Sequence, residues 1–117
     1  MEVSQFWKMV KDVNWSSDQD YNRIKKYLMT TLSKQEIEGL QSINSKLEAA
    51  LYKVLDKYDS EIRSERGHGY GLGDDSFGDL ISEIISRGEA FYNQVLQSPD
   101  LALEMAEKGD YSEKFSY

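Results

Sequence analysis

The chain contains no cysteine, a single proline and a single histidine, and it has no long apolar run. Without cysteine it can form neither a disulfide nor a thiolate metal site, which suits a cytoplasmic protein. No stretch approaches the roughly 18 apolar residues that cross a bilayer, and residues 1–5 lack the basic-then-apolar pattern of a secretory signal. We therefore expect a cytoplasmic protein that is not embedded in a membrane.

Basic residues are outnumbered by acidic ones, and the imbalance lies in one half of the chain. The formal net charge is −7; residues 1–58 carry nine Lys/Arg against eight Asp/Glu, whereas residues 59–117 carry five against thirteen. Nucleic acids and anionic membranes are poor partners for such a protein, because their negative charge would be repelled. The balance favours either a basic protein partner or simply a soluble surface.

The spacing of apolar residues predicts helices along most of the chain. With 117 residues, 39% of them apolar and 30% charged, the sequence fits one compact domain, residues 1–117. Apolar residues recur at intervals of three and four, as on the buried face of a helix. We predict an all-α, single-domain bundle of about five helices with one glycine-rich loop. The helices are expected around residues 6–13, 21–32, 33–58, 74–96 and 98–108.

Three segments of this bundle carry more specific expectations. The third helix, with Ser33 and Glu36 as a capping box, is the longest and is expected to lie through the centre of the bundle. Asn44 interrupts its apolar stripe, and a hydrogen-bonded or rim position is expected for it. The fourth helix keeps one phase through Gly88, which predicts close packing against another helix or a kink. Residues 110–117 either pack back on the bundle or form a flexible tail.

Residues 66–77, Arg-Gly-His-Gly-Tyr-Gly-Leu-Gly-Asp-Asp-Ser-Phe, break the helical pattern. Four glycines on alternate positions predict a flexible loop, because glycine adopts backbone conformations that other residues avoid. Asp74 or Asp75 is expected to cap the helix that follows. The loop is a poor phosphate cradle, because it lacks the lysine of a nucleotide-binding loop and leads into a helix that begins with carboxylates. We expect no nucleotide and no other cofactor.

The only histidine, His68, lies between two glycines of this loop. Histidine can serve acid–base catalysis, but it would need a nucleophile, a metal or a second titrating group held within hydrogen-bond distance. Asp74 and Asp75 are near in sequence, yet the glycine-rich spacer between them and His68 fixes no geometry. A solvated loop residue, a partner contact and a catalytic group all stay open for His68. We predict that the protein is not an enzyme.

Asp75, Asp79 and Glu83 follow one another at intervals of four and would line one face of the fourth helix. Such a ridge could hold a divalent cation, but metal sites in bundles draw ligands from several helices, often through Glu-x-x-His pairs, and the predicted fourth helix contains no such pair. Arg87, four residues after Glu83, suits a surface ion pair. We predict no metal, and the ridge is either a solvated acidic face or a surface that meets a basic protein.

Two groups of residues together point to a known family. The first is Phe6-Trp7, and the second runs through Gly71-Leu72-Gly73-Asp74-Asp75-Ser76-Phe77, Ile84-Ile85, Gly88, Phe91-Tyr92 and Ser98-Pro99-Asp100-Leu101-Ala102. These segments resemble a bacterial family known as domain of unknown function 4240, and the resemblance implies an all-helical fold. The chain departs from the family's pattern at Gly73, Leu80-Ile81 and Glu83, where the pattern has serine, Phe-Arg and tryptophan. If that arginine and tryptophan form a site in relatives, this chain has lost it.

Three functions stay open for this sequence. The first is a small acidic protein-binding module, an immunity protein or antitoxin that neutralises a basic bacterial toxin domain. Its partner-binding residues would be the loop and helix-start residues His68, Tyr70, Asp74, Asp75, Asp79 and Glu83. The second is a structural or regulatory bundle whose acidity only keeps it soluble. The third is a small-ligand binder or hydrolase that uses the loop as a lid over a pocket lined by Asp74, Asp75 and His68.

Overall fold

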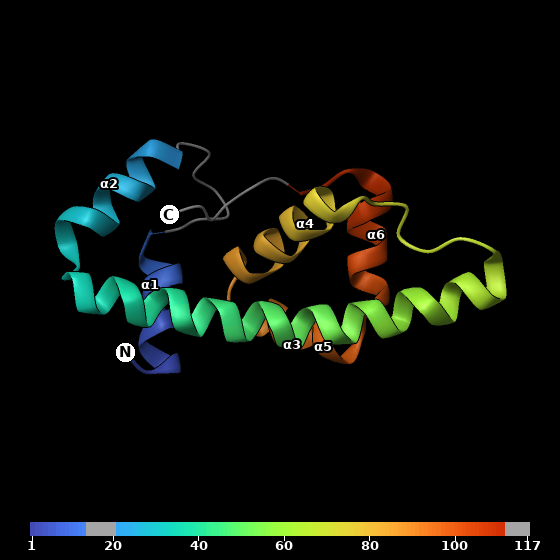
Figure 1. Cartoon of the computed structure of the whole chain (residues 1–117), viewed down its shortest axis with the longest axis horizontal. Helices are drawn as coiled ribbons and strands as arrows, with labels where there is room; N and C mark the ends of the chain where they lie inside the picture. The colour runs from blue at the N-terminus through green and yellow to red at the C-terminus, as the bar shows by residue number, and fades with distance from the viewer. Residues whose placement is uncertain (14–20, 112–117) are drawn as a thin grey trace.

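A computed structural model describes residues 1–13 and 21–111, with side chains described for residues 1–12 and 26–111. This part of the chain holds six helices and no strand: α1 (Val3–Val13), α2 (Tyr21–Thr31), α3 (Lys34–Arg66), α4 (Asp74–Ser86), α5 (Glu89–Gln97) and α6 (Asp100–Lys108). The predicted all-α class is therefore confirmed, with six helices where about five were expected (Figure 1). None of the helices in these ranges has both the length and the apolar character needed to span a bilayer.

The longest helix, α3, runs the length of the molecule. Its 33 residues, at about 1.5 Å per residue, match the longest dimension of 48 Å. The predicted capping box is confirmed, since Ser33 Oγ accepts from the Glu36 N–H and Glu36 Oε1 accepts from the Ser33 N–H. The helix ends at Gly67, whose left-handed backbone lets its N–H donate to the Arg63 carbonyl.

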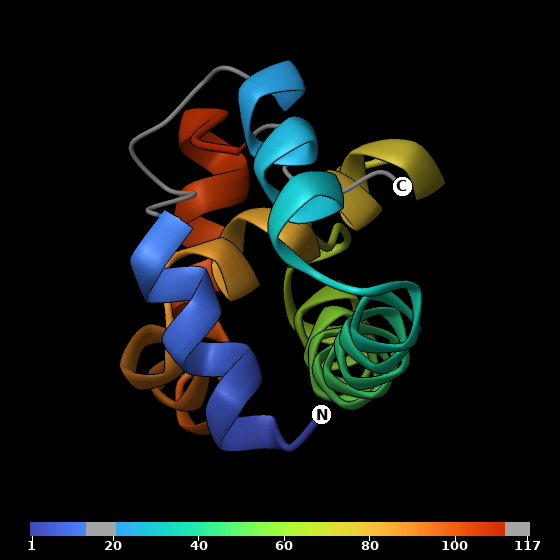
Figure 2. The ribbon, with the colours of Figure 1, turned by 90° about the vertical axis from the view of Figure 1, so that its left-hand side faces the viewer.

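Two predictions for α3 are wrong. The helix does not stop at residue 58 but continues to Arg66, because Ile62 is buried and Asp59 pairs with Arg63 one turn on. The helix is also not the centre of the bundle. Figure 2 looks along α3 and shows the other helices gathered to one side of it. The opposite face of α3 is exposed, at Lys46, Lys53, Asp56 and Lys57 among others.

The second half of α4 occupies the centre instead. All seven residues from Leu80 to Ser86 are buried, and α4 packs against α3, α5 and α6. Three of these seven, Ser82, Glu83 and Ser86, are polar, so an apolar stripe alone would not have placed them inside. The most completely buried stretch of helix therefore belongs to α4, a helix of 13 residues.

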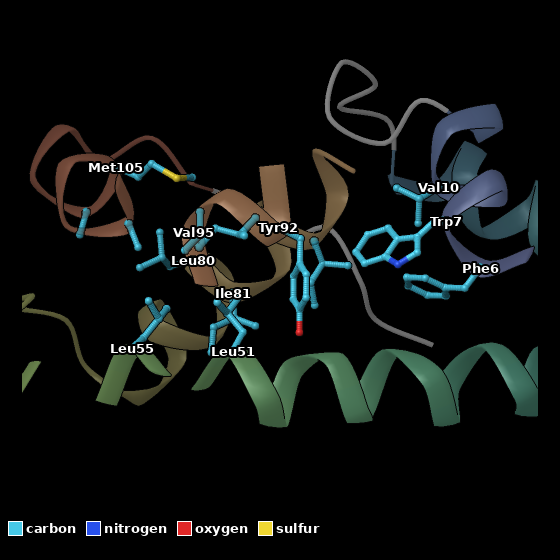
Figure 3. Close-up of a cluster of buried hydrophobic side chains, with 14 of the residues drawn as sticks. Phe6, Trp7, Val10, Leu51, Leu55, Leu80, Ile81, Tyr92, Val95 and Met105 are labelled. Atoms are coloured by element: carbon cyan, nitrogen blue, oxygen red, sulfur yellow. The ribbon is translucent and has the colours of Figure 1, made fainter. Parts of the chain in front are cut away.

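The hydrophobic core surrounds the second half of α4 and contains residues of both α1 and α6, which lie far apart in the sequence. Phe6 and Val10 of α1 reach it from one side, and Leu51 and Leu55 of α3 form its floor (Figure 3). Tyr92 of α5 crosses the core and donates its hydroxyl to the Leu47 carbonyl of α3 at 2.8 Å. Burial raises the pKa of Tyr92, which keeps the hydroxyl protonated as a donor.

Gly88 separates two helices rather than lying inside one. The chain turns between α4 and α5, where Gly88 has φ 102° and ψ 172° and its N–H donates to the Ile85 carbonyl. A Cβ at this position would meet nothing within 4 Å, so the predicted close packing is wrong. Glycine is needed here for its backbone conformation, which residues with a side chain rarely adopt.

Gly88→Ala is expected to lower the free energy of unfolding by about 1–3 kcal/mol, because alanine is strained at this φ and ψ. Gly78 lies inside α4 and has room for a Cβ, so Gly78→Ala should instead raise the free energy of unfolding by about 0.5–1 kcal/mol. Urea denaturation followed by circular dichroism measures both values. Equal losses in the two variants would contradict the conformational reason given for Gly88.

Candidate functional site

The glycine-rich loop is fixed to α3 at its middle. One carboxylate oxygen of Asp59 accepts from the Tyr70 N–H at 2.8 Å, and the other accepts from Arg63 Nε at 2.7 Å. Gly69 passes so close to this pair that a Cβ there would overlap the Asp59 carboxylate and approach the Arg63 guanidinium. The loop therefore follows a defined path, and the absence of a side chain at residue 69 allows it to do so.

Tyr70 is the residue that this path places in the core. Its side chain is 5% exposed, its ring lies 6.1 Å from Tyr58 and 5.6 Å from Phe77, and its hydroxyl donates to the Pro99 carbonyl at 3.3 Å. Burial raises the pKa of Tyr70, and the nearby Tyr58 and Asp59 add to the rise. The sequence analysis listed Tyr70 as a partner-binding residue, but the structure buries its ring. The ring faces inward because Asp59 binds the Tyr70 backbone.

His68 stands on the outer side of the same loop. Its side chain is exposed, and its Nε2 lies 2.9 Å from Nη2 of Arg66, which also lies 3.5 Å from a carboxylate oxygen of Glu107. The ring nitrogen accepts from the guanidinium, which can only donate. This contact orients His68 toward the C-terminal end of α3 and α6.

The two adjacent aspartates open α4 without capping it. Gly73 occupies the N-cap position and makes no side-chain cap hydrogen bond, so the predicted cap by Asp74 or Asp75 is wrong. Both aspartates lie in the first turn, where the partial positive charge of the helix end stabilises their carboxylates. Both are exposed, which leaves their negative charge open to another molecule.

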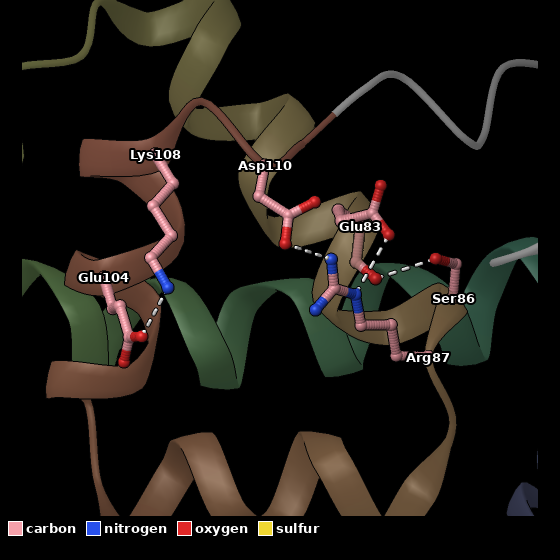
Figure 4. A network of polar contacts seen from close by, with 6 residues as sticks. All are labelled: Glu83, Ser86, Arg87, Glu104, Lys108 and Asp110. Atoms are coloured by element: carbon pink, nitrogen blue, oxygen red, sulfur yellow. Dashed lines mark hydrogen bonds and ion pairs between the residues drawn. The ribbon is translucent and has the colours of Figure 1, made fainter.

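The ridge Asp75, Asp79 and Glu83 passes from the surface into the interior. Asp75 is exposed, Asp79 is partly buried and Glu83 is 6% exposed. Glu83 Oε2 accepts from Arg87 Nε at 3.1 Å, and Arg87 Nη2 donates to Asp110 at 2.9 Å (Figure 4). Burial alone would lower the pKa of Arg87, but the hydrogen bonds to Asp110 and Glu83 outweigh it and raise that pKa. Glu83 therefore joins α4 to the chain after α6 rather than facing a partner.

The described residues contain no group of three or more acidic, histidine or cysteine side chains that could hold a metal ion. Asp110, the first residue of the segment whose packing was left open, is tied to Arg87 by the contact just described. Tyr111, the next residue, is partly buried and packs against the core, so the described start of the segment lies on the bundle. The prediction for residues 112–117 lies outside the described residues.

A groove between α3 and the start of α4 has no counterpart in the sequence analysis. It has a volume of about 450 Å³ and is lined by Glu48, Ala49, Tyr52, Asp74, Phe77, Gly78 and Ile81. The walls are aromatic, since the Tyr52 and Phe77 rings meet edge to face at 5.5 Å. Tyr52 is 52% exposed although its neighbour Leu51 is fully buried. The sequence did carry a signal for this wall. Tyr52 lies one position after the buried Leu51 and four positions after Glu48, which places an aromatic and an acidic side chain on one face of α3.

The groove carries negative charge on both sides. Asp74 lies at the α4 side, and Glu48 lies at the α3 side, where its carboxylate accepts from Asn44 Nδ2 at 2.6 Å. Burial raises the pKa of Glu48 because it removes water from the charged carboxylate. Asn44 itself is 6% exposed rather than at the rim, and its Oδ1 has no hydrogen-bond partner among the described residues. Two carboxylates beside two aromatic rings complement a positively charged group.

Of the three residues expected beneath a loop acting as a lid, only Asp74 lines the groove; Asp75 and His68 do not. The geometry therefore brings Asp74 together with Glu48, Tyr52 and Phe77, and it separates these residues from His68. An exposed acidic helix start therefore lies beside an aromatic groove.

The described part of the chain is thus an all-α protein with an acidic, aromatic-lined groove between α3 and α4. The chain belongs to the family described as "Protein of unknown function (DUF4240)", whose model matches residues 1–117. No curated protein and no solved structure matches the chain.

Of the positions that depart from the family's pattern, Gly73 is exposed at the N-cap of α4, and the other three are buried. Leu80 and Ile81, in place of Phe-Arg, are core residues, and Ile81 also forms part of the groove floor. Glu83, in place of tryptophan, is buried and paired with Arg87. These three residues build the interior of this chain, and none of them is exposed.

Asp59→Ala is expected to lower the free energy of unfolding by about 1–3 kcal/mol, because the Tyr70 N–H loses its acceptor in a partly buried position. Asp56, one turn earlier and exposed, is the matched control, and Asp56→Ala should change that free energy by less than about 0.5 kcal/mol. Chemical denaturation of the two variants measures both free energies and shows whether Asp59 stabilises the attachment of the loop to α3. Equal effects would show that Asp59 does not hold the loop.

Glu48→Gln is expected to be more stable than the parent protein at neutral pH. The folded-state pKa of Glu48 is raised, so ionisation opposes folding, and this cost appears as the pH rises from the unfolded value through the folded one. The difference should vanish below about pH 4, where glutamate is protonated in both states. Denaturation curves from acidic to neutral pH measure it, with exposed Glu61→Gln as the control. A Glu48→Gln variant that is less stable at neutral pH would contradict the sign.

Proposed function

We propose that this protein is a small acidic protein-binding module of the bacterial cytoplasm, an immunity protein or antitoxin that neutralises a toxin domain. The surface that would bind the toxin is the start of α4 together with the adjacent groove. One observation supports this most directly: exposed Asp74 and Asp75 lie beside a groove that has carboxylates and aromatic rings on its walls. Asp79 and His68 would lie at the margin of the contact.

Charge supports a basic partner. The protein has a net charge of −7, and residues 59–117 carry five basic side chains against thirteen acidic ones. Several of these acids are used within the molecule, since Asp59, Glu83 and Asp110 each pair with an arginine. No ion pair joins Asp74 or Asp75 to another described residue, so their field extends into solvent. Such a field accelerates association with a basic surface and selects against acidic ones.

The groove supports a specific contact rather than attraction alone. A lysine or arginine side chain of the partner could lie against Tyr52 and Phe77 and meet the carboxylates of Glu48 and Asp74. A cation over an aromatic face gains about 0.5–2 kcal/mol, more when water is excluded. Burial of one such anchor in a pocket is how interfaces of modest size gain most of their affinity. The raised pKa of Glu48 fits this role, because a cation would restore the stabilisation that burial removes.

The test begins with the reading frames that adjoin the gene: a basic toxin-like domain encoded there is expressed, its affinity is measured by isothermal titration calorimetry and protection is measured by co-expression. Asp74→Lys/Asp75→Lys should weaken binding at least about tenfold, and Tyr52→Ala about thirtyfold if it is an anchor. Asp56→Lys/Glu61→Lys changes the net charge equally at exposed α3 positions outside the groove and should have little effect. Added salt should weaken binding of the parent protein.

Equal losses in the two charge-reversed variants would mean that general attraction, not this surface, produces binding. If the parent protein neither binds nor protects against that domain, the immunity function fails. The remaining reading is then a structural or regulatory bundle without a dedicated toxin partner.

A further inference from the structure

A second hollow lies between α1 and the turn that joins α4 to α5. Its volume is about 790 Å³, within the range of small-molecule sites, and it shares no residue with the groove of α3 and α4. Its α1 wall includes Ser4, Lys8 and Lys11, which lie on one face of the helix at intervals of four and three. We call this hollow the lysine cleft.

The lysine cleft gathers positive charge on an acidic protein. Lys8 and Lys11 are both exposed, and neither forms an ion pair within the described part of the chain. Arg87 also lines the cleft, but its guanidinium is already held by Glu83 and Asp110. The charge available to a ligand is therefore that of the two ammonium groups, one helical turn apart.

The opposite wall supplies hydrogen-bond donors. Gly88 begins α5 without a side-chain cap, and Gly88, Glu89 and Ala90 line the cleft. The first N–H groups of a helix lack acceptors within it and stabilise a negative charge placed near them. Glu89 is exposed at the same helix start and would repel an anion, so an anion should lie nearer to the lysines than to Glu89.

Apart from Ser86, the remaining surface of the lysine cleft is apolar. Trp7 lines it and is 8% exposed, with its ring held by Phe6 at 5.2 Å and Tyr92 at 5.4 Å. Val3 and Val10 complete this side from α1. A ligand that fills the cleft must therefore offer an apolar body as well as a charged group.

We propose that the lysine cleft binds a small phosphate monoester with an apolar body. The phosphate would lie between Lys8 and Lys11 and the first N–H groups of α5, and the body would lie against Trp7 and Val10. A phosphate monoester carries close to two negative charges at neutral pH, which matches two unpaired ammonium groups better than a single carboxylate does. This site is independent of the surface proposed to bind a toxin.

The test is calorimetric titration of the full chain with phenyl phosphate, with inorganic phosphate and benzoate as comparison probes. Phenyl phosphate should bind most tightly, because inorganic phosphate lacks the body and benzoate lacks the second charge. Lys8→Gln/Lys11→Gln should weaken its binding by about tenfold or more. Lys53→Gln/Lys57→Gln makes the same change of net charge on the exposed face of α3 and should leave affinity unchanged. Glu89→Gln should strengthen binding, because it removes the like charge.

Ala90→Trp tests the same site by filling it. The larger side chain would occupy the lysine cleft without changing its charge, so binding of phenyl phosphate should be abolished. Circular dichroism confirms that each variant is folded. Failure of the parent protein to bind phenyl phosphate at millimolar concentrations would overturn the proposal. So would equal weakening by the two lysine pairs, because that result would trace binding to overall charge.

Discussion

The contact between Asp59 and the backbone of Tyr70 holds the loop to α3, and the position of α4 depends on it. A chain leaving the end of α3 at Gly67 could run in many directions, because glycine at alternate positions restricts it little. The Asp59 carboxylate selects one of them, since it accepts from the Tyr70 N–H while Arg63 holds its other oxygen. Tyr70 then packs on Tyr58 and Phe77, which fixes the first turn of α4 against α3. The groove exists because these two helices are held at this point.

The charged side chains that form ion pairs within the molecule are different from those that are exposed and unpaired among the described residues. Glu83, Arg87 and Asp110 form a partly buried series that ties α4 to the end of α6. Asp74 and Asp75 contribute to the helix end but have no arginine or lysine partner among the described residues. The same division holds for the cations, since Arg87 is paired while Lys8 and Lys11 form no ion pair with any residue that the structure describes. The two hollows therefore carry opposite charge, although the chain as a whole is acidic.

Sequence spacing predicted the class of fold, through the local periodicity of apolar residues, and the capping box at Ser33, through a serine and a glutamate three positions apart. It failed where a tertiary contact decides the outcome. The polar run after residue 58 stays helical because Ile62 is buried, and Tyr70 turns inward because Asp59 binds its backbone. For the site, Asp74 and Asp75 were found from their position after the loop. Glu48 and Tyr52 were missed, because only the crossing of α3 and α4 brings them beside Asp74.

Along the 13 residues of α4, tolerance to substitution should change sharply from one end to the other. In the first turn Asp74 and Asp75 are exposed, whereas Phe77 packs against the core, so the two aspartates can be exchanged without repacking the bundle. From Leu80 to Ser86 every side chain is enclosed, and a change in volume there would disturb three neighbouring helices at once. A lineage could thus acquire a new specificity by altering one helical turn while inheriting its scaffold unchanged.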